Sequence, residues 1–340
     1  MTFDRRRLPG LIRGFTTLLF ATSAHAAVIT EVHYTMGTYF TMTVDAVEDS
    51  SARRVMRSCF ADARHVETVF SRFDPASELN RVNADPAQTI ALGADMADLL
   101  GRALSLHDAT HGAFDVAIGD VTAFWRESAT WPAVVSRNTT RERIRLRGHT
   151  LVKVDPSARL DFDGIAKGYA VDRCVVLLRR AGVTRALVSL GESSQYALGA
   201  PEGETGWSIA LRGDDPTATV GTIRLRDQAL SASAVFGHSR TLAGQRIGHI
   251  IDPETGAPLH ASALAVVVAD NATDAEAFSK AALIWGARGN RVGALHGPSP
   301  SRRIQAVVYV EDGRVSRWRS DAIHFVPARR FLRPGEEPLS

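Results

Sequence analysis

Apolar residues recur at helical spacing in several stretches of this 340-residue chain. Such spacing indicates helices that bury one face against a core. The predicted helices cover residues 50–70, 94–111 and 273–285, with a short helix opening at residues 77–80 and another that ends at Ala181 before Gly182. Residues 130–148 are polar and rich in arginine, which indicates an exposed excursion between elements.

Short apolar runs bounded by turn residues predict the strands. These runs cover residues 28–34, 38–44, 185–190, 207–211, 219–225, 229–236, 249–251, 263–269, 304–309 and 315–318. The four runs between residues 207 and 251 are expected to form one antiparallel system, and the last two runs a hairpin. Because strands and helices do not alternate strictly, the predicted fold class is α+β.

The N-terminal residues 1–26 have the features of a secretory signal. Arginines 5–7 and 13 precede a short apolar run, and Ala24-His25-Ala26 offers a cleavage site after Ala26. We therefore expect export to the periplasm, by the general secretory route rather than the twin-arginine route. The alternatives are a disordered or membrane-anchoring N-terminus, although the run is too short to span a bilayer.

Loss of residues 1–26 changes the charge of the chain. It removes four arginines and one aspartate, which lowers the formal net charge from +3 to 0. A neutral mature chain gives no reason to expect binding to nucleic acid. The mature chain also lacks a predicted transmembrane span, and the proline-containing tail 327–340 is expected to be frayed.

The two cysteines fall on the apolar stripes of predicted helices. Cys59 lies in the helix 50–70 and Cys174 in the helix that ends at Ala181. Two buried free thiols are the favoured interpretation. A disulfide is the alternative, since the periplasm permits one.

The stretch from Asp161 to Asp172 predicts a turn that leads into a helix. Asp163 is a suitable N-cap. Lys167 would lie in the first helical turn, where the free N–H groups favour an anion over a cation. A bound phosphate would explain this lysine, and a solvated side chain on a capped helix is the alternative.

The same stretch, D-x-x-G-I-A-K-G-Y-A-V-D, resembles the central signature of the FAD:protein FMN transferase (ApbE-like) family. Further segments are similar to that family's motifs in the same order, namely Met36-Gly37-Thr38, Phe73 with Ser77-Glu78-Leu79-Asn80, residues 112–116 (G-A-F-D-V) and residues 249–256 (H-I-I-D-P-E-T-G). The resemblance implies a T-fold-like architecture of mixed or antiparallel sheets packed with helices. It places one large domain at residues 27–326.

The resemblance also implies a set of site residues. The residues that would line an FAD site are Met36, Phe73, Ala113, Phe114, Asp115, Asp161, Lys167 and Ile250. Aromatic and apolar side chains can pack on flat rings, and carboxylates can accept hydrogen bonds from a nucleotide. His249 would take the proton from an attacking hydroxyl. Taken singly, each apolar residue could instead pack in the core, and His249 could be structural.

The metal site of the family has only a partial counterpart here. The resemblance implies Mg²⁺ bound by the backbone carbonyl of Gly164 and by an aspartate and a threonine on a helix, where this chain has Glu276 and Lys280. An ammonium cannot ligate Mg²⁺, so magnesium is expected to bind weakly or not at all. Asp274 is an alternative ligand in another register. Glu276 and Lys280 could also form a helical ion pair.

The resemblance implies a periplasmic enzyme that transfers FMN from FAD to a threonine or serine hydroxyl and releases AMP. Expected acceptors are membrane redox proteins, such as a quinone-reductase-type subunit or a nitrous-oxide-reduction regulator. Two alternatives remain open at this point. The chain could be a non-catalytic FAD-binding or flavin-delivery protein, or a pyrophosphatase that splits FAD into FMN and AMP.

Overall fold

The computed structural model describes residues 27–46, 49–127, 140–212, 219–237, 239–242, 244–289, 304–311, 314–319 and 324–328. The predicted signal segment 1–26 and most of the tail 327–340 lie outside these residues, so those boundaries stay predictions. None of the described helices has the length and apolar character needed to cross a bilayer.

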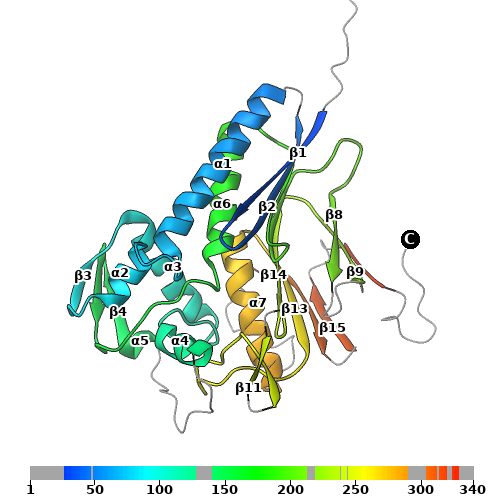
Figure 1. Ribbon diagram of the computed structural model, residues 1–340. Helices are drawn as coiled ribbons and strands as arrows, with labels where there is room; N and C mark the ends of the chain where they lie inside the picture. Colours follow the sequence, from blue (N-terminus) through cyan, green and yellow to red (C-terminus); the bar gives the residue numbers. More distant parts are fainter. Residues whose placement is uncertain are drawn as a thin grey trace, which may run out of the picture.

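An antiparallel sheet of eight strands forms the centre of the molecule (Figure 1). Its strand order is β1-β2-β6-β7-β10-β13-β14-β15. The bounds are β1 (Ala27–Thr35), β2 (Thr38–Ala46), β6 (Ala186–Leu190), β7 (Ser194–Leu198), β10 (Gln228–Ala234), β13 (Ala263–Ala269), β14 (Ile304–Glu311) and β15 (Arg314–Arg319).

The central sheet is covered on both faces. Helices α1 (Asp49–Phe70), α6 (Ala166–Arg180) and α7 (Ala272–Ala287) pack on one face, and a three-stranded sheet of β8 (Trp207–Arg212), β9 (Thr219–Leu225) and β16 (His324–Pro327) packs on the other. Alternate residues of β13 therefore enter different cores, Ala265 below α7 and Val266 below the small sheet. This explains why β13 is buried at every position and reads as a continuous apolar run.

A side lobe, made of the described parts of residues 78–153, extends from the helical layer (Figure 1). It holds α2 (Glu78–Ala84), β3 (Thr89–Ala91), α3 (Ala94–Ala109), α4 (Gly119–Glu127), α5 (Thr140–Arg143), β4 (Ile144–Arg147) and β5 (Thr150–Lys153). Strands β3, β5 and β4 form a separate three-stranded sheet of the lobe, in that order. A hairpin of β11 (Ser239–Leu242) and β12 (Gln245–Gly248) follows β10.

The α+β class and the long predicted helices are confirmed, but the predicted antiparallel system over residues 207–251 is wrong. Strands β8 and β9 belong to the small sheet, whereas β10 lies in the central sheet between β7 and β13. Residues 249–251 form no strand and contribute one isolated bridge, from Ile251 to Pro258. The apolar runs look alike in sequence because both sheets bury one face in the same core.

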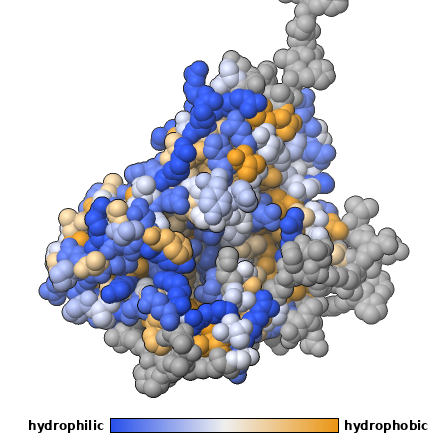
Figure 2. Space-filling view, in the orientation of Figure 1, coloured by the Kyte–Doolittle hydropathy of each residue, from blue (hydrophilic) through white to orange (hydrophobic). Residues whose placement is uncertain are grey.

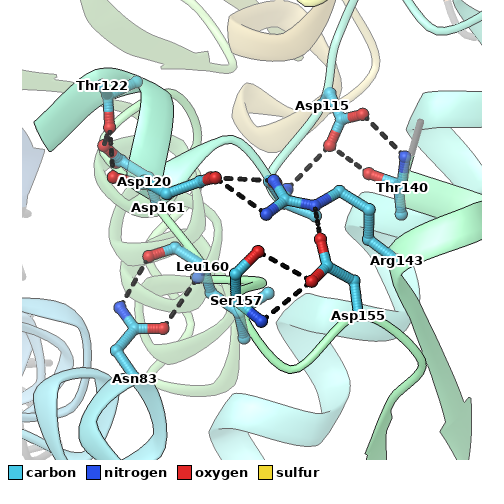
Figure 3. A network of polar contacts seen from close by, with 12 residues as sticks. Asn83, Asp115, Asp120, Thr122, Thr140, Arg143, Asp155, Ser157, Leu160 and Asp161 are labelled. Carbon is cyan, nitrogen blue, oxygen red and sulfur yellow. Dashed lines mark hydrogen bonds and ion pairs between the residues drawn. The ribbon is translucent and has the colours of Figure 1, made fainter. Parts of the chain in front are cut away.

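The predicted exposed excursion over residues 130–148 is correct only in part for its described residues, because Glu142, Arg145, Arg147 and Gly148 are exposed whereas Thr140, Arg143 and Ile144 are buried. Arg143 is only 1% exposed. Its guanidinium donates to both oxygens of Asp120 at 2.8 Å, to Asp155 at 3.0 Å and to the carbonyl of Ala117 (Figure 3). Burial alone would lower the pKa of Arg143, but the hydrogen bonds and charges of Asp120 and Asp155 outweigh it and raise the pKa.

The favoured interpretation of the cysteines as free thiols is wrong as well. Cys59 of α1 and Cys174 of α6 form a disulfide, with their Cα atoms 4.8 Å apart. Both residues lie on the stripes by which the two helices pack together, so the same burial that suggested inert thiols brings the sulfur atoms into contact.

Helices α6 and α7 cross with their backbones in contact. A Cβ atom on Gly168 would lie 2.5 Å from the carbonyl oxygen of Ala272, so only glycine fits at this position. Four residues further along α6, the carboxylate of Asp172 accepts hydrogen bonds from the N–H groups of Ala272 and Thr273, at 2.7 and 3.0 Å. Asp172 therefore satisfies N–H groups at the start of α7 that have no partner within the helix.

We predict that Gly168→Ala destabilises the protein, because the added methyl group would meet backbone atoms that cannot move alone. Overpacking of this kind costs about 1–3 kcal/mol. Gly101→Ala in α3 is the matched control, since its Cβ would lie 3.6 Å from the nearest atom, Cδ2 of Leu146. Urea unfolding of the two variants measures the difference, and equal stabilities would contradict the tight crossing.

A second prediction concerns the buried arginine. Arg143→Ala leaves Asp120 and Asp155 without their shared cation, which is expected to cost about 3–5 kcal/mol in the free energy of unfolding. Arg147→Ala removes an exposed arginine from the neighbouring strand and should change stability by less than about 0.5 kcal/mol. Thermal or urea unfolding would decide, and similar midpoints for both variants would show that the network is not stabilising.

Candidate functional site

The turn before α6 differs in detail from the prediction. Asp163 is not the N-cap, because α6 begins at Ala166 with Ile165 in the cap position. No side chain caps α6, and Asp161 instead stabilises the preceding turn, since its Oδ1 accepts the N–H of Asp163 at 2.9 Å. Asp163 is exposed and forms an ion pair with Arg72. Lys167 does lie in the first turn of α6, as predicted.

Lys167 and Lys280 meet at one buried carboxylate. Their Nζ atoms lie 3.8 and 3.9 Å from Oε1 of Glu276 on α7. The Glu276 side chain has no solvent exposure, whereas those of Lys167 and Lys280 are 26% and 17% exposed. The N–H of Gly168 donates to Oε2 at 3.0 Å, and the hydroxyl of Ser194 donates to Oε1. We call Lys167, Glu276 and Lys280 the lysine cluster.

The lysine cluster lies against the turn that precedes α6. A Cβ atom on Gly164 would be 3.5 Å from Cδ of Lys280 and 3.2 Å from the ring of Phe114. The stem of Lys280 therefore packs beneath this turn, beside an aromatic ring predicted to contact a flavin nucleotide. Burial, together with the charge of Lys167, lowers the pKa of Lys280 to about 8, although Glu276 acts in the opposite direction.

These residues do not fit a magnesium site. Mg²⁺ requires oxygen ligands in near-octahedral geometry. Both oxygens of Glu276 already accept hydrogen bonds and face two ammonium groups, so the predicted ligands Glu276 and Lys280 leave the Gly164 carbonyl without a suitable partner. Asp274, the alternative ligand, belongs to no cluster of three acidic, histidine or cysteine side chains, and the described residues contain no such cluster.

Asp161 is held by helix α4. Its Oδ2 accepts the hydroxyl of Thr122 at 2.6 Å (Figure 3). The same oxygen accepts a hydrogen bond from Nη1 of Arg126 at 3.3 Å. Arg72 lies near both Arg126 and Asp161. Burial and the charge of Arg126 lower the pKa of Arg72, and the charge of Asp161 partly offsets this effect. Arg72 and Arg126 are thus additional cations near the turn. The sequence motifs did not reveal them, since both lie outside the matching segments.

Asp115 is engaged within the protein. One oxygen accepts the N–H of Ala117 at 2.7 Å and the hydroxyl of Thr140, and the other accepts the N–H of Thr140 at 3.0 Å (Figure 3). The residue is 7% exposed. Its carboxylate therefore fixes the turn that carries Ala113 and Phe114, both of which are buried.

The other predicted FAD residues have different surroundings. Met36 has a positive φ of 51° in the turn between β1 and β2. It packs on the main core, the one between the central sheet and the helices. Phe73 is 79% exposed, with the guanidinium of Arg72 above its ring at 4.3 Å. Ile250 is buried in the main core. Because Arg72 also pairs with Asp163, Phe73 lies near the turn before α6.

His249 is exposed just after the β11–β12 hairpin, with its ring 3.8 Å from a Cβ atom built on Gly237. Helix α4 connects this region with the turn at Asp161. The indole N–H of Trp125 donates to the carbonyl of Gly256 at 2.6 Å, and a guanidinium N–H of Arg240 donates to the carbonyl of Arg126 at 3.1 Å. Helix α4 thus contacts segments on both sides of His249 in the sequence, and it also holds the carboxylate of Asp161.

Figure 2 shows the surface hollowed between the side lobe and the central sheet, with mostly hydrophilic residues around the hollow. This is the region where Figure 1 shows the beginning of α6. The structure therefore brings together Phe114, Gly164, Lys167, Glu276 and Lys280 by direct contact. Asp161, Phe73 and His249 are linked to this group through neighbouring residues.

Comparison with known proteins gives consistent results. The FAD:protein FMN transferase of Klebsiella pneumoniae is 25% identical over 307 residues, covering 84% of this chain and 87% of that protein. The one of Haemophilus influenzae is 27% identical over 312 residues, covering 81% and 87%. Among solved structures, the ApbE protein of Thermotoga maritima matches with a TM-score of 0.75 at 21% identity, covering 87% of this chain and 97% of that chain.

Flavin transferase ApbE of Vibrio cholerae has the same fold, with a TM-score of 0.71 at 22% identity, covering 87% of this chain and 98% of that chain. These structures confirm the predicted single α+β domain with antiparallel sheets. The sequence profile of the ApbE family matches residues 36–295, which include the turn at Asp161, both lysines and His249. Since that match covers most of its length, this chain belongs to the ApbE family.

Proposed function

We propose that this chain is an exported enzyme that moves FMN from FAD onto a threonine or serine hydroxyl of a membrane redox protein. The observation that carries the proposal is the lysine cluster. Its two ammonium groups are partly exposed, its carboxylate is buried, and the stem of Lys280 packs beneath Gly164, beside Phe114. Such a cluster suits a diphosphate that lies beside an aromatic ring. The relatives' names, FAD:protein FMN transferase, support the same activity.

The proposed reaction is a displacement at phosphorus. The acceptor's hydroxyl oxygen bonds to the phosphorus of the FMN half, the bond from that phosphorus to the bridging oxygen breaks, and AMP leaves with that oxygen. The hydroxyl proton passes to His249, since a hydroxyl is a weak nucleophile without a base. Lys167 and Lys280 offset the negative charge on the phosphates while the bonds change.

Two observations support an exported location. Residues 1–26 have the pattern of a cleavable secretory signal. The pairing of Cys59 with Cys174 is compatible with an oxidising compartment such as the periplasm. An exported transferase would meet acceptors whose flavinylated segments are on the same side of the membrane, such as a quinone-reductase-type subunit or a nitrous-oxide-reduction regulator.

We predict that the mature chain binds FAD noncovalently and more tightly than FMN. FAD offers a diphosphate to the lysine cluster, whereas FMN offers a single phosphate. Titration followed by flavin fluorescence measures both affinities, and ADP should compete with FAD because it has the same diphosphate. Equal affinity for FAD and FMN, or no flavin binding, would contradict the proposed site.

We further predict that His249→Ala leaves FAD affinity nearly unchanged but slows transfer by about 10²–10⁴-fold, the usual contribution of a positioned base. His324→Ala is the control, because that histidine is exposed on the small sheet. The assay uses FAD and a quinone-reductase subunit with a flavinylation threonine, and measures the acceptor's mass.

The same assay separates the alternatives. A mass increase by FMN that is lost when the acceptor threonine is changed to alanine supports the transferase. AMP and free FMN formed without acceptor would indicate a pyrophosphatase. FAD binding without turnover would indicate a flavin-delivery protein. Equal loss of FAD binding and transfer in His249→Ala would show that His249 is structural.

A further inference from the structure

The charges in the lysine cluster favour an anion over a cation. Within the lysine cluster, the side chain of Glu276 is fully buried, whereas those of Lys167 and Lys280 are partly exposed to solvent. An approaching divalent cation would meet positive charge first and a carboxylate whose oxygens already accept hydrogen bonds. An approaching phosphate would meet two donors, with the N-terminal end of α6 beside them.

The use of lysine at both positions is itself unusual in this chain. The sequence has 40 lysines and arginines, of which only Lys153, Lys167 and Lys280 are lysines. Lys153 is buried and donates to the carbonyls of Val82 and Asp85. Arginine therefore fills every other basic position, while the lysine cluster uses two compact ammonium groups. A planar guanidinium is wider and binds in a fixed fork, so it would not replace them equally.

We infer that Lys280 binds the diphosphate of FAD in place of a divalent metal ion, and that Glu276 is the positioning residue that holds both ammonium groups toward the ligand. This inference rests on the proposed function. Two lysines and one carboxylate leave one net positive charge, to which the start of α6 adds. The stem of Lys280, packed beneath Gly164, fixes where that charge lies.

The first test compares FAD affinity in EDTA and in Mg²⁺. The unchanged protein should bind FAD equally well in both. Lys280→Thr should weaken binding in EDTA by about 10- to 100-fold, the range for loss of a hydrogen bond to a charged group. Arg180→Thr is the matched control, since it removes one positive charge from the exposed C-terminal end of α6. It should bind FAD like the unchanged protein.

The second test rebuilds an oxygen-ligand set. Glu276→Asp combined with Lys280→Thr removes the ammonium and shortens the carboxylate, so Mg²⁺ should now strengthen FAD binding. A role of Glu276 and Lys280 limited to helix stability would leave FAD affinity insensitive to Mg²⁺ in this double variant, which would overturn the inference.

The third test needs no substitution. An amine-acetylating reagent followed by mass spectrometry of peptides should modify Lys167 and Lys280 in the free protein and leave the buried Lys153 unmodified. FAD should protect both reactive lysines in EDTA. Protection of Lys167 alone, or FAD binding that requires Mg²⁺, would overturn the inference while leaving the proposed function intact. If neither FAD nor ADP binds under any condition, the proposed function fails as well.

Discussion

The backbone of α6 touches the backbone of α7 at Gly168, and the arrangement of the site depends on that contact. The crossing brings the N–H of Gly168 within 3.0 Å of Glu276 and so places the neighbouring Lys167 against the same carboxylate. Asp172 strengthens the crossing by accepting N–H groups at the start of α7. Burial raises the pKa of Asp172 to about 6, while hydrogen bonds from Thr273 and the backbone lower it, so this carboxylate is costly to charge and is held by its donors.

Periodicity predicted the elements that bury a regular face, and local motifs predicted the turn at Asp161. What could not be predicted are partners that come from distant segments. Arg143 was assigned to the surface because its neighbours are polar, but Asp120 and Asp155 meet it only in the folded lobe. The Glu276–Lys280 pair was anticipated from helical spacing, whereas the contributions of Gly168 and Ser194 require α6 and β7 to pack on α7. A single sequence carries no signal for such contacts.

Helix α4 has a larger role than its nine residues suggest. Its apolar residues Val121 and Trp125 pack with Leu242 and Ile247 of the β11–β12 hairpin in a small separate core. Its polar residues Thr122 and Arg126, on an adjacent face of the helix, hold Asp161. A shift of α4 would therefore move the turn before α6 and the segment after His249 together. Helix α4 is thus one element that connects the two parts of the proposed site.

The disulfide between Cys59 and Cys174 closes a covalent ring with a sequence separation of 115 residues, and the whole side lobe lies inside it. A ring of this size removes conformational freedom from the unfolded chain, worth about 4–5 kcal/mol in the loop-entropy description. The lobe carries Phe114 and the residues that hold Asp161, so both ends of its connection to the sheet are tied at one point. If the lobe were to unfold locally, the disulfide would therefore keep α1 and α6 joined, and refolding would start with the two ends of the lobe already together.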